Sequence, residues 1–280
     1  MDNSFKTVIK PQTGWFDINI RELFSYRDLI FLLVKRNYST RYKQTILGPA
    51  WLVLSPLINT IISTIVFGKI AKIPSDGIPY FLFFLCGSSL WNYFATSLSN
   101  ISSTFTANTS VFGKVYFPRL AIPISTVITG ILDFAVQFIL FLGFMLYFNL
   151  IGAHIRPNLY MLLIPLVLFQ MSFLALGCGI IISSLTTKYR DLTVLVGFGI
   201  NLWMYITPVI YSTNSLPEQF QTLCLLNPVA PIIEVFRYAC LGTGEISFFY
   251  WFLSVAVTCI VLFIGVIIFS HVEKDFMDTV

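Results

Sequence analysis

Residues 246–270 read ISFFYWFLSVAVTCIVLFIGVIIFS and contain no Asp, Glu, Lys or Arg. A helix needs roughly 20 apolar residues to cross the hydrocarbon core of a bilayer, so this stretch is long enough to span it. Further stretches free of these charged residues are 44–68, 77–113, 157–187 and 192–217, and 120–155 is interrupted only by Asp133. The pattern predicts that the chain crosses a membrane about six times.

The composition of the chain supports the same interpretation. Of its 280 residues, 56% are hydrophobic and 11% are charged, and the mean hydropathy is +0.82. Soluble domains carry about 25% charged residues. We therefore expect an all-α integral membrane protein with six transmembrane helices. The first begins at Gly48 and is kinked at Pro56, and the others lie near 80–105, 122–148, 159–184, 192–212 and 248–270.

The Lys and Arg residues indicate how the chain is oriented. With both ends on one side of the membrane, 13 of the 17 Lys and Arg residues lie on that side and four on the other. The 13 are the eight that precede position 44 together with Lys114, Arg119, Lys188, Arg190 and Lys274. Short loops rich in Lys and Arg stay in the cytoplasm, so both termini are predicted to be cytoplasmic. We interpret the net charge of +4 as a signal of topology and not of nucleic-acid binding.

The first 45 residues differ from the rest of the chain. Residues 1–17 are expected to be a loose tail, without the apolar run of a secretory signal peptide. Residues 18–38 are predicted to form a helix, because apolar residues recur every 3–4 positions. These residues are Leu23, Tyr26, Ile30, Leu33 and Val34. A helix with one apolar face and basic flanks lies along the membrane surface. We expect 1–45 to be a cytoplasmic tail with an amphipathic interface helix, and 46–280 to be the transmembrane domain.

The segment 213–245 is predicted to lie outside, between the fifth and sixth spans. It is apolar in parts but is punctuated by Pro217, Pro228 and Pro231, so it is too broken to span the membrane. It fits two short re-entrant helices that dip into the outer leaflet, since non-helical backbone at that depth is tolerated when buried in protein or lining a water-filled path. A compact outer cap fits the composition equally well.

Residues for catalysis or energy coupling do not form a recognisable set. Gly68-Lys69 and Gly113-Lys114 both lack the first glycine of the P-loop pattern GxxxxGK[ST]. Paired carboxylates, a Ser–His–Asp set and a cluster of metal ligands are not evident, so we expect neither a catalytic nor a metal site. Asp133 lies well inside a predicted span and is interpreted either as a proton or cation site or as a partner for hydroxyls or a basic side chain. The chain thus resembles a conduit whose energy comes from elsewhere.

Aromatic residues make up 16% of the chain. Many are expected to face lipid or to form interfacial belts. Sugars also stack their C–H faces on aromatic rings, and such contacts tolerate a sliding polymer. The candidates for a channel of this kind are Trp51, Trp91, Tyr93, Phe94, Trp203 and Tyr205.

Four segments resemble a known family. They are 27–51, which contains RYKQTILGPAW; 74–80, PSDGIPY; 114–120, KVYFPRL; and 189–192, YRDL. The resemblance is to the membrane subunit of bacterial type-2 ABC exporters for polysaccharides, and most closely to the O-antigen exporter permease of the Wzm type. It covers nearly the whole chain.

The resemblance implies a homodimer in the bacterial inner membrane, bound to two cytoplasmic ATPase subunits. Those partner subunits would bind ATP and Mg, so no cofactor is expected in this chain. The cargo implied is a polysaccharide linked to undecaprenyl pyrophosphate. O antigen is the first choice, with teichoic acid or a capsular polysaccharide as the alternative. A flippase or carrier that works without ATP is the rival from another class, and it would depend strongly on Asp133.

The resemblance also assigns roles to residues on the cytoplasmic side. The interface helix, the 114–120 loop and the 189–191 turn would contact or brace the ATPase subunits. The residues concerned are Leu23, Tyr26, Arg27, Lys114, Tyr116, Phe117, Pro118, Arg119, Arg190 and Asp191. Aromatic side chains with a polar rim suit an interface hot spot, although a plain basic turn between spans is the alternative. Replacing Phe117 or Arg119 by Ala is expected to uncouple transport without preventing membrane insertion.

A basic cluster precedes the first span. It consists of Lys35, Arg36, Arg41 and Lys43. Basic side chains here suit a pyrophosphate headgroup, which Arg grips with two hydrogen bonds. Topology and contact with anionic lipids explain the same residues equally simply.

Overall fold

The computed structural model describes residues 20–43, 46–112, 117–153, 155–189 and 191–279. Regular secondary structure in these ranges is entirely helical. The α-helices are α1 (Ile20–Ser25), α2 (Arg27–Tyr42), α3 (Trp51–Ser63), α4 (Tyr80–Ser102), α5 (Thr104–Phe112), α6 (Ala121–Leu150), α7 (Ile164–Lys188), α8 (Leu192–Ile206), α9 (Glu218–Leu226), α10 (Val229–Leu241) and α11 (Phe248–Thr279). Shorter helical turns are η1 (Gly48–Ala50), η2 (Thr64–Ile70), η3 (Leu159–Leu163) and η4 (Thr213–Ser215).

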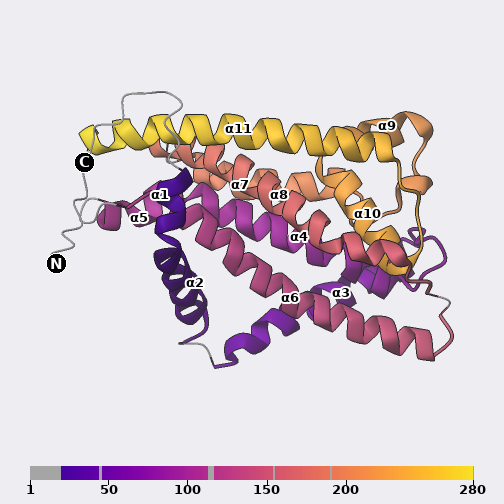
Figure 1. Cartoon of the computed structure of the whole chain (residues 1–280). Coiled ribbons are helices and arrows are strands. Elements are labelled where there is room, and N and C mark those ends of the chain that lie inside the picture. Colours follow the sequence, from indigo (N-terminus) through magenta and orange to yellow (C-terminus); the bar gives the residue numbers. More distant parts are fainter. Residues whose placement is uncertain (1–19, 44–45, 113–116, 154, 190, 280) are drawn as a thin grey trace.

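The long helices form an elongated bundle (Figure 1). Helix α11 packs on α7, α7 packs on α4, and α4 packs on α6. At one end of the bundle lie α1, α2, α5 and the C-terminal end of α11, and we call it the α2 end. At the opposite end lie α9 and the start of α11, and we call it the α9 end.

Within the described ranges, four helices are long and apolar enough to cross a membrane. They are Gly48–Ile70, Ala121–Leu150, Leu159–Thr187 and Phe248–Val272. The bent pair α9 and α10 makes a fifth if it counts as one span. Helix α8 has only 15 residues, and α4 is long enough at 23 residues but carries several serines and asparagines. A helix forms at each of the six predicted positions, and the number of crossings stays a prediction.

Helix α4 is the centre of the bundle. Leu82, Phe83 and Phe94 are fully buried, because α4 is covered by α6, α7 and α10. Several of its serines bond within the helix: the Ser89 hydroxyl donates to the Cys86 carbonyl at 2.8 Å, a pattern that lets serine sit inside an apolar helix. Burial by protein, and not by lipid, explains why this helix is less apolar than its neighbours.

Glycines allow α7 and α11 to approach closely. A Cβ atom at Gly177 would lie 2.8 Å from the backbone nitrogen of Leu262, and one at Gly265 would lie 2.8 Å from the Gly177 carbonyl oxygen. Small residues that let helix backbones meet are a common way to pack helices in membranes. The Gly177 position therefore serves packing within one chain. Gly197 and Gly199 on α8, in contrast, have nothing within 4 Å of a Cβ atom.

Replacing Gly177 by Leu is expected to lower the stability of the bundle by about 1–3 kcal/mol, because the new side chain must push the α11 backbone away. Thermal unfolding of the purified protein in detergent measures the effect. Gly143→Leu is the matched control, since nothing lies within 4 Å of a Cβ atom there. Equal melting temperatures for the two variants would contradict the close packing of α7 on α11.

The N-terminal helix differs from its predicted form. Two helices, α1 and α2, replace the single helix 18–38 and continue to Tyr42. The break lies at Tyr26, whose φ of −93° and ψ of 19° are not helical. Leu33 and Val34 are buried as the periodicity predicts, whereas Phe31 is 65% exposed. Helix α2 thus packs one face on α6 and leaves part of its apolar surface uncovered.

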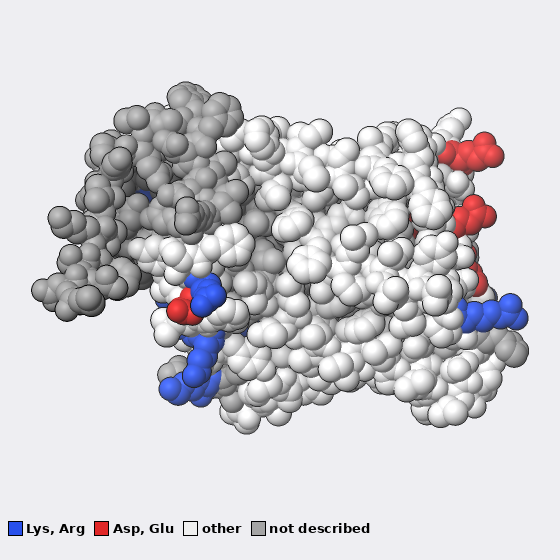
Figure 2. Space-filling model, in the orientation of Figure 1, with Lys and Arg blue, Asp and Glu red and all other residues white. Residues whose placement is uncertain are grey.

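On one face of the molecule the exposed charged residues lie at its two ends. On the face that Figure 2 shows, the coloured Lys, Arg, Asp and Glu residues gather at the ends and leave the middle uncharged. A middle band without charge matches what the hydrocarbon core of a bilayer requires.

The predicted outer segment forms two short helices. Helices α9 and α10 are bent by 101° at Asn227-Pro228. Helix α9 exposes Phe220 and Leu223, whereas every residue of α10 except Tyr238 is buried. The helical expectation is met, and the depth of these helices in a membrane stays a prediction.

Candidate functional site

The aromatic residues predicted to line a channel fall into two groups. On α4, Trp91, Tyr93 and Phe94 are at most 3% exposed. Phe94 meets Trp203 of α8 edge-on, with ring centroids 5.2 Å apart, and the Tyr93 hydroxyl lies 2.6 Å from the Ser172 hydroxyl of α7. Tyr93 thus joins α4 to α7, and the Phe94–Trp203 contact joins α4 to α8.

Trp51 and Tyr205 form the second group and point out of the bundle, with 45% and 62% of their surface exposed. They belong to α3 and α8, each of which has a largely uncovered face. On α8, Ile200 is the buried residue, and the exposed apolar side chains are Val194, Leu195, Phe198, Leu202 and Ile206. Of the predicted set, only Trp51 and Tyr205 offer mostly exposed rings to a molecule outside this chain.

Asp133 forms an ion pair with Arg41. Asp133 lies on α6 and is 8% exposed, and Arg41 lies in the last turn of α2. The two residues are 92 positions apart in the chain, so the pair ties the N-terminal helix to a long helix of the bundle. Pairing with a basic side chain was one of the two interpretations of Asp133.

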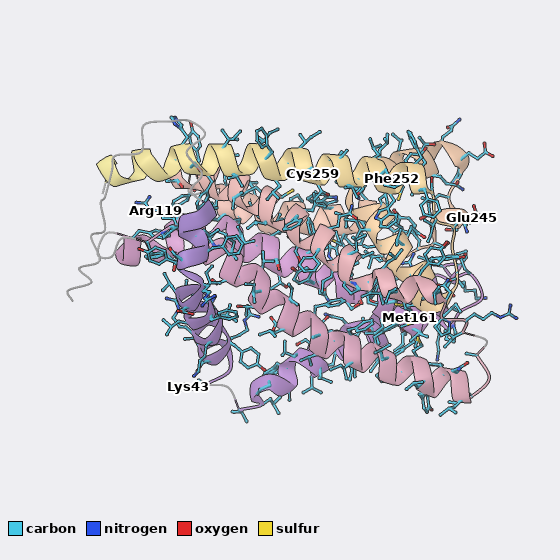
Figure 3. All side chains as sticks on the ribbon, viewed as in Figure 1. Lys43, Arg119, Met161, Glu245, Phe252 and Cys259 are labelled. Atoms are coloured by element: carbon cyan, nitrogen blue, oxygen red, sulfur yellow. The ribbon has the colours of Figure 1, made fainter. Side chains whose placement is uncertain are left out.

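The structure pairs one residue of the predicted basic cluster with an acid. Arg41 is paired with Asp133, whereas Lys35, Arg36 and Lys43 are exposed. Lys43 lies at the tip of α2 in Figure 3, at the α2 end of the bundle. Three exposed cations thus remain near one another on α2 and just after it, where they are accessible to an anion.

The predicted coupling loop is anchored by buried side chains. Phe117 and Arg119 are only 7% and 4% exposed. The rings of Phe117 and Phe112 are 5.8 Å apart, and the Arg119 guanidinium lies 5.1 Å from the centre of the Phe112 ring. Phe112 in turn contacts Phe105, which stacks on Phe269 of α11 at 4.7 Å. We call the group formed by Phe105, Phe112, Phe117, Arg119 and Phe269 the α2-end cluster.

The burial of Phe117 and Arg119 changes the expected role of these side chains. The hot-spot prediction requires them to face an ATPase, but both side chains instead pack on Phe112 of α5. Pro118 is partly exposed, and Lys114 and Tyr116 lie outside the described residues.

The other residues predicted to couple to an ATPase lie around the same end, as far as the structure describes them. Leu23 and Tyr26 pack against the α2-end cluster. Arg27 is exposed, with its Nε 3.8 Å from Asp28. Asp191 is exposed at the start of α8, and Arg190 lies outside the described residues.

Sequence reasoning missed a fully buried ion pair inside α10. Arg237 is 1% exposed and Glu234 is 6% exposed, and Arg237 Nη1 lies 3.2 Å from Glu234 Oε1. Arg237 is one of the four Lys and Arg residues that the charge count assigns to the outer side, and Glu234 has no predicted role. The signal was available: an acid and a base three residues apart share a helix face, and both lie in an otherwise apolar stretch.

A family model described as ABC-2 type transporter matches residues 28–241. This chain belongs to the ABC-2 type transporter family. The chain is also 29% identical over 252 residues to an O-antigen export system permease protein RfbA of Klebsiella pneumoniae, covering 90% of this chain and 94% of the relative. A protein of the same description from Myxococcus xanthus is 29% identical over 221 residues, 78% of this chain and 82% of its own.

A third relative carries a different description. The polysialic acid transport protein KpsM of Escherichia coli is 23% identical over 251 residues, covering 88% of this chain and 94% of its own. In this ABC-2 type transporter the matched residues run from α2 to the end of α10. They include the Arg41–Asp133 and Glu234–Arg237 pairs and the exposed face of α8.

Proposed function

We propose that this chain is the membrane subunit of an ATP-driven exporter that moves a lipid-linked polysaccharide, most simply O antigen, out of the cytoplasm. The observation that carries the proposal is the match to the ABC-2 type transporter family together with O-antigen export permeases that align over 90% of the chain. The polymer is linked to undecaprenyl pyrophosphate, and ATP and Mg are bound by two separate ATPase subunits. The chain itself supplies the path and catalyses no reaction.

We propose further that the α2 end faces the cytoplasm of a bacterial cell and the α9 end faces outward across the inner membrane. Supporting this, α1 and the C-terminal end of α11 lie at the same end of the bundle (Figure 1). The exposed Arg27, Lys35, Arg36 and Lys43 also lie on or beside α2. Basic residues that stay in the cytoplasm favour this orientation. On this topology α4 and α8 supply the two crossings beyond the four apolar spans, and α9 and α10 re-enter from outside.

Two copies of the chain form the channel in this proposal. The exposed faces of α3 and α8 support it, because apolar helix faces left uncovered must meet lipid or another helix. Gly197 and Gly199 on α8 have open space around them and so allow a second copy to approach. Trp51 and Tyr205 are the rings that would contact the glycan.

The exposed cations on α2 are proposed to receive the pyrophosphate headgroup. Replacing Lys35, Arg36 and Lys43 together by Gln is expected to raise the KM for the lipid-linked substrate roughly tenfold, a loss of about 1.4 kcal/mol of binding. Export by proteoliposomes that contain the chain and its ATPase, measured over a range of substrate concentration, gives the KM. The matched control is Lys69→Gln with Lys72→Gln, which removes exposed cations from the segment between α3 and α4; that segment lies at the α9 end in Figure 1. An equal rise in KM in the control would contradict a headgroup site on α2.

The ATPase subunits are proposed to dock at the α2 end, on α1, α2 and the backbone of the coupling loop. The Arg41–Asp133 pair would carry movement of α2 to α6, since the two helices pack together. Neither a proton nor a cation needs to bind Asp133 in this scheme.

A second cargo, a capsular polysaccharide, is favoured by the similarity to the polysialic acid transport protein. Deleting the gene of this chain in its native host separates the two cargoes and tests the proposal itself. Loss of surface polysaccharide with lipid-linked polymer retained inside supports export, and the sugars and linkage of the retained polymer identify the cargo. Unchanged surface polysaccharide would contradict the proposed function.

A further inference from the structure

The ion pair of Glu234 and Arg237 lies fully inside the protein, near the α9 end. Figure 3 shows Glu245, a few residues beyond α10, at that end. Both charged side chains have been removed from water, and the attraction between them does not by itself recover that cost: a buried ion pair is often no more stabilising than a well-packed apolar pair. The contacts that the pair makes with other elements are therefore the feature to explain.

Arg237 connects α10 to the turn that follows α8. Its Nη2 donates to the Pro208 carbonyl oxygen at 2.7 Å and lies 3.5 Å from the Val209 carbonyl oxygen. Pro208 comes two residues after the end of α8. The last carbonyl groups of a helix give its C-terminal end a partial negative charge, so a guanidinium bound to the carbonyls just after α8 lies in a favourable place.

The same guanidinium also contacts α4. Its central carbon lies 3.9 Å from the centre of the Phe83 ring, a cation–π distance. A Cβ atom at Gly87 would lie 3.0 Å from Arg237 Nη2, so a glycine leaves room for the side chain. Glu234 adds a fourth element, because the Thr213 hydroxyl of η4 donates to its Oε1 at 2.5 Å.

One donor of this network is not used. Among the described residues, Arg237 Nε is buried without a hydrogen-bond partner. Buried donors without a partner are rare, and each one costs free energy. An arrangement selected only for stability would satisfy this donor or replace the pair by apolar residues.

We propose that the Glu234–Arg237 pair is a latch that fixes the outer end of α8 to α10 and α4, and that its release lets this end of α8 move when polymer leaves. The two residues are positioning residues: they act through the turn 207–212 and do not contact the glycan. Tyr205 and Ile206, the exposed last residues of α8, are the side chains that this movement would carry. The movement during polymer exit rests on the proposed function, whereas the contacts of the latch do not.

Hydrogen exchange of the purified chain tests whether the latch holds the end of α8 in place. Glu234→Gln and Arg237→Gln are expected to raise the exchange rate of amides in the turn 207–212 about tenfold, a size typical of coupling between two sites. Arg237→Lys keeps the charge and is expected to restore part of the protection. The matched control is Tyr80→Phe, which removes a neutral hydrogen bond of 2.7 Å to the Ile210 carbonyl of the same turn. An equal increase of the exchange rate in the control, or no increase in the latch variants, would show that the pair does not hold this turn.

Leakage of a small dye from proteoliposomes without ATP tests whether release of the latch opens a path across the membrane. The latch variants are expected to leak about tenfold faster than the wild type, and the Tyr80→Phe control at the wild-type rate. Faster exchange without leakage would overturn the gating role. If Arg237→Gln does not reach the membrane, Thr213→Val, which removes the second hydrogen bond to Glu234, replaces it in both assays. Neither assay needs ATP, glycan or an ATPase, so failure of the latch and failure of the exporter proposal give different results.

Discussion

Phe117→Ala is expected to lower the free energy of unfolding by about 3–5 kcal/mol, the usual range for truncating a buried Phe. The reason is the α2-end cluster: Phe117 is 7% exposed, and its ring lies 5.8 Å from that of Phe112. The alanine leaves a cavity among aromatic side chains that connect the coupling loop to α11. Equilibrium unfolding of the purified chain in mixed detergent micelles measures the change.

The control for this experiment is Phe31→Ala, because Phe31 is 65% exposed on α2. Truncation there is expected to change the unfolding free energy by less than about 0.5 kcal/mol. If Phe117→Ala were as stable as the control while ATPase coupling was lost, the ring would contact the ATPase directly, as the sequence first suggested. That outcome would contradict the packing described for the cluster.

Asp133→Arg combined with Arg41→Asp is expected to export polysaccharide, whereas each single variant is expected to be nearly inactive. A single change leaves two like charges facing each other, and removing one partner of a charge-assisted hydrogen bond costs about 1–3 kcal/mol. Asp133 is 8% exposed, so water cannot substitute for the lost partner easily. The swapped pair restores the link between α2 and α6.

Export and ATPase activity of the three variants separate the possible roles of the pair. Recovery in the double variant shows that the pair matters as a link. An inactive double variant with normal folding and ATPase binding would contradict the link, and would return Asp133 to consideration as a proton or cation site and Arg41 as a headgroup ligand.

The helices could largely be predicted from the sequence, and their environments could not. The long uncharged stretches become α3, α4, α6, α7, α8 and α11, because apolar segments of this length have few alternatives to a helix. Composition alone does not fix the count of spans. Helix α4 is surrounded by protein, so it tolerates serines that a lipid-facing helix would not. The break at Tyr26 was not visible, because the apolar periodicity continues through it.

The candidate site shows the same limit. Composition selects the residue types suited to sugars and phosphates, but it does not reveal which way a side chain points. The sequence makes Trp91 and Trp51 equally good candidates for a channel residue, but Trp91 is buried and Trp51 is exposed. The Arg41–Asp133 contact joins positions 92 apart, which a single sequence cannot predict. The Glu234–Arg237 pair is local, and attention to charges inside apolar stretches would have found it.

Dependence on a separate ATPase is the centre of this account, and affinity purification of the tagged chain from its native membrane in mild detergent tests it most directly. We predict recovery of a P-loop ATPase subunit in equal amount, with vanadate-sensitive ATP hydrolysis. Recovery of this chain alone, with movement of the lipid-linked glycan unaffected by ATP depletion, would contradict the exporter proposal.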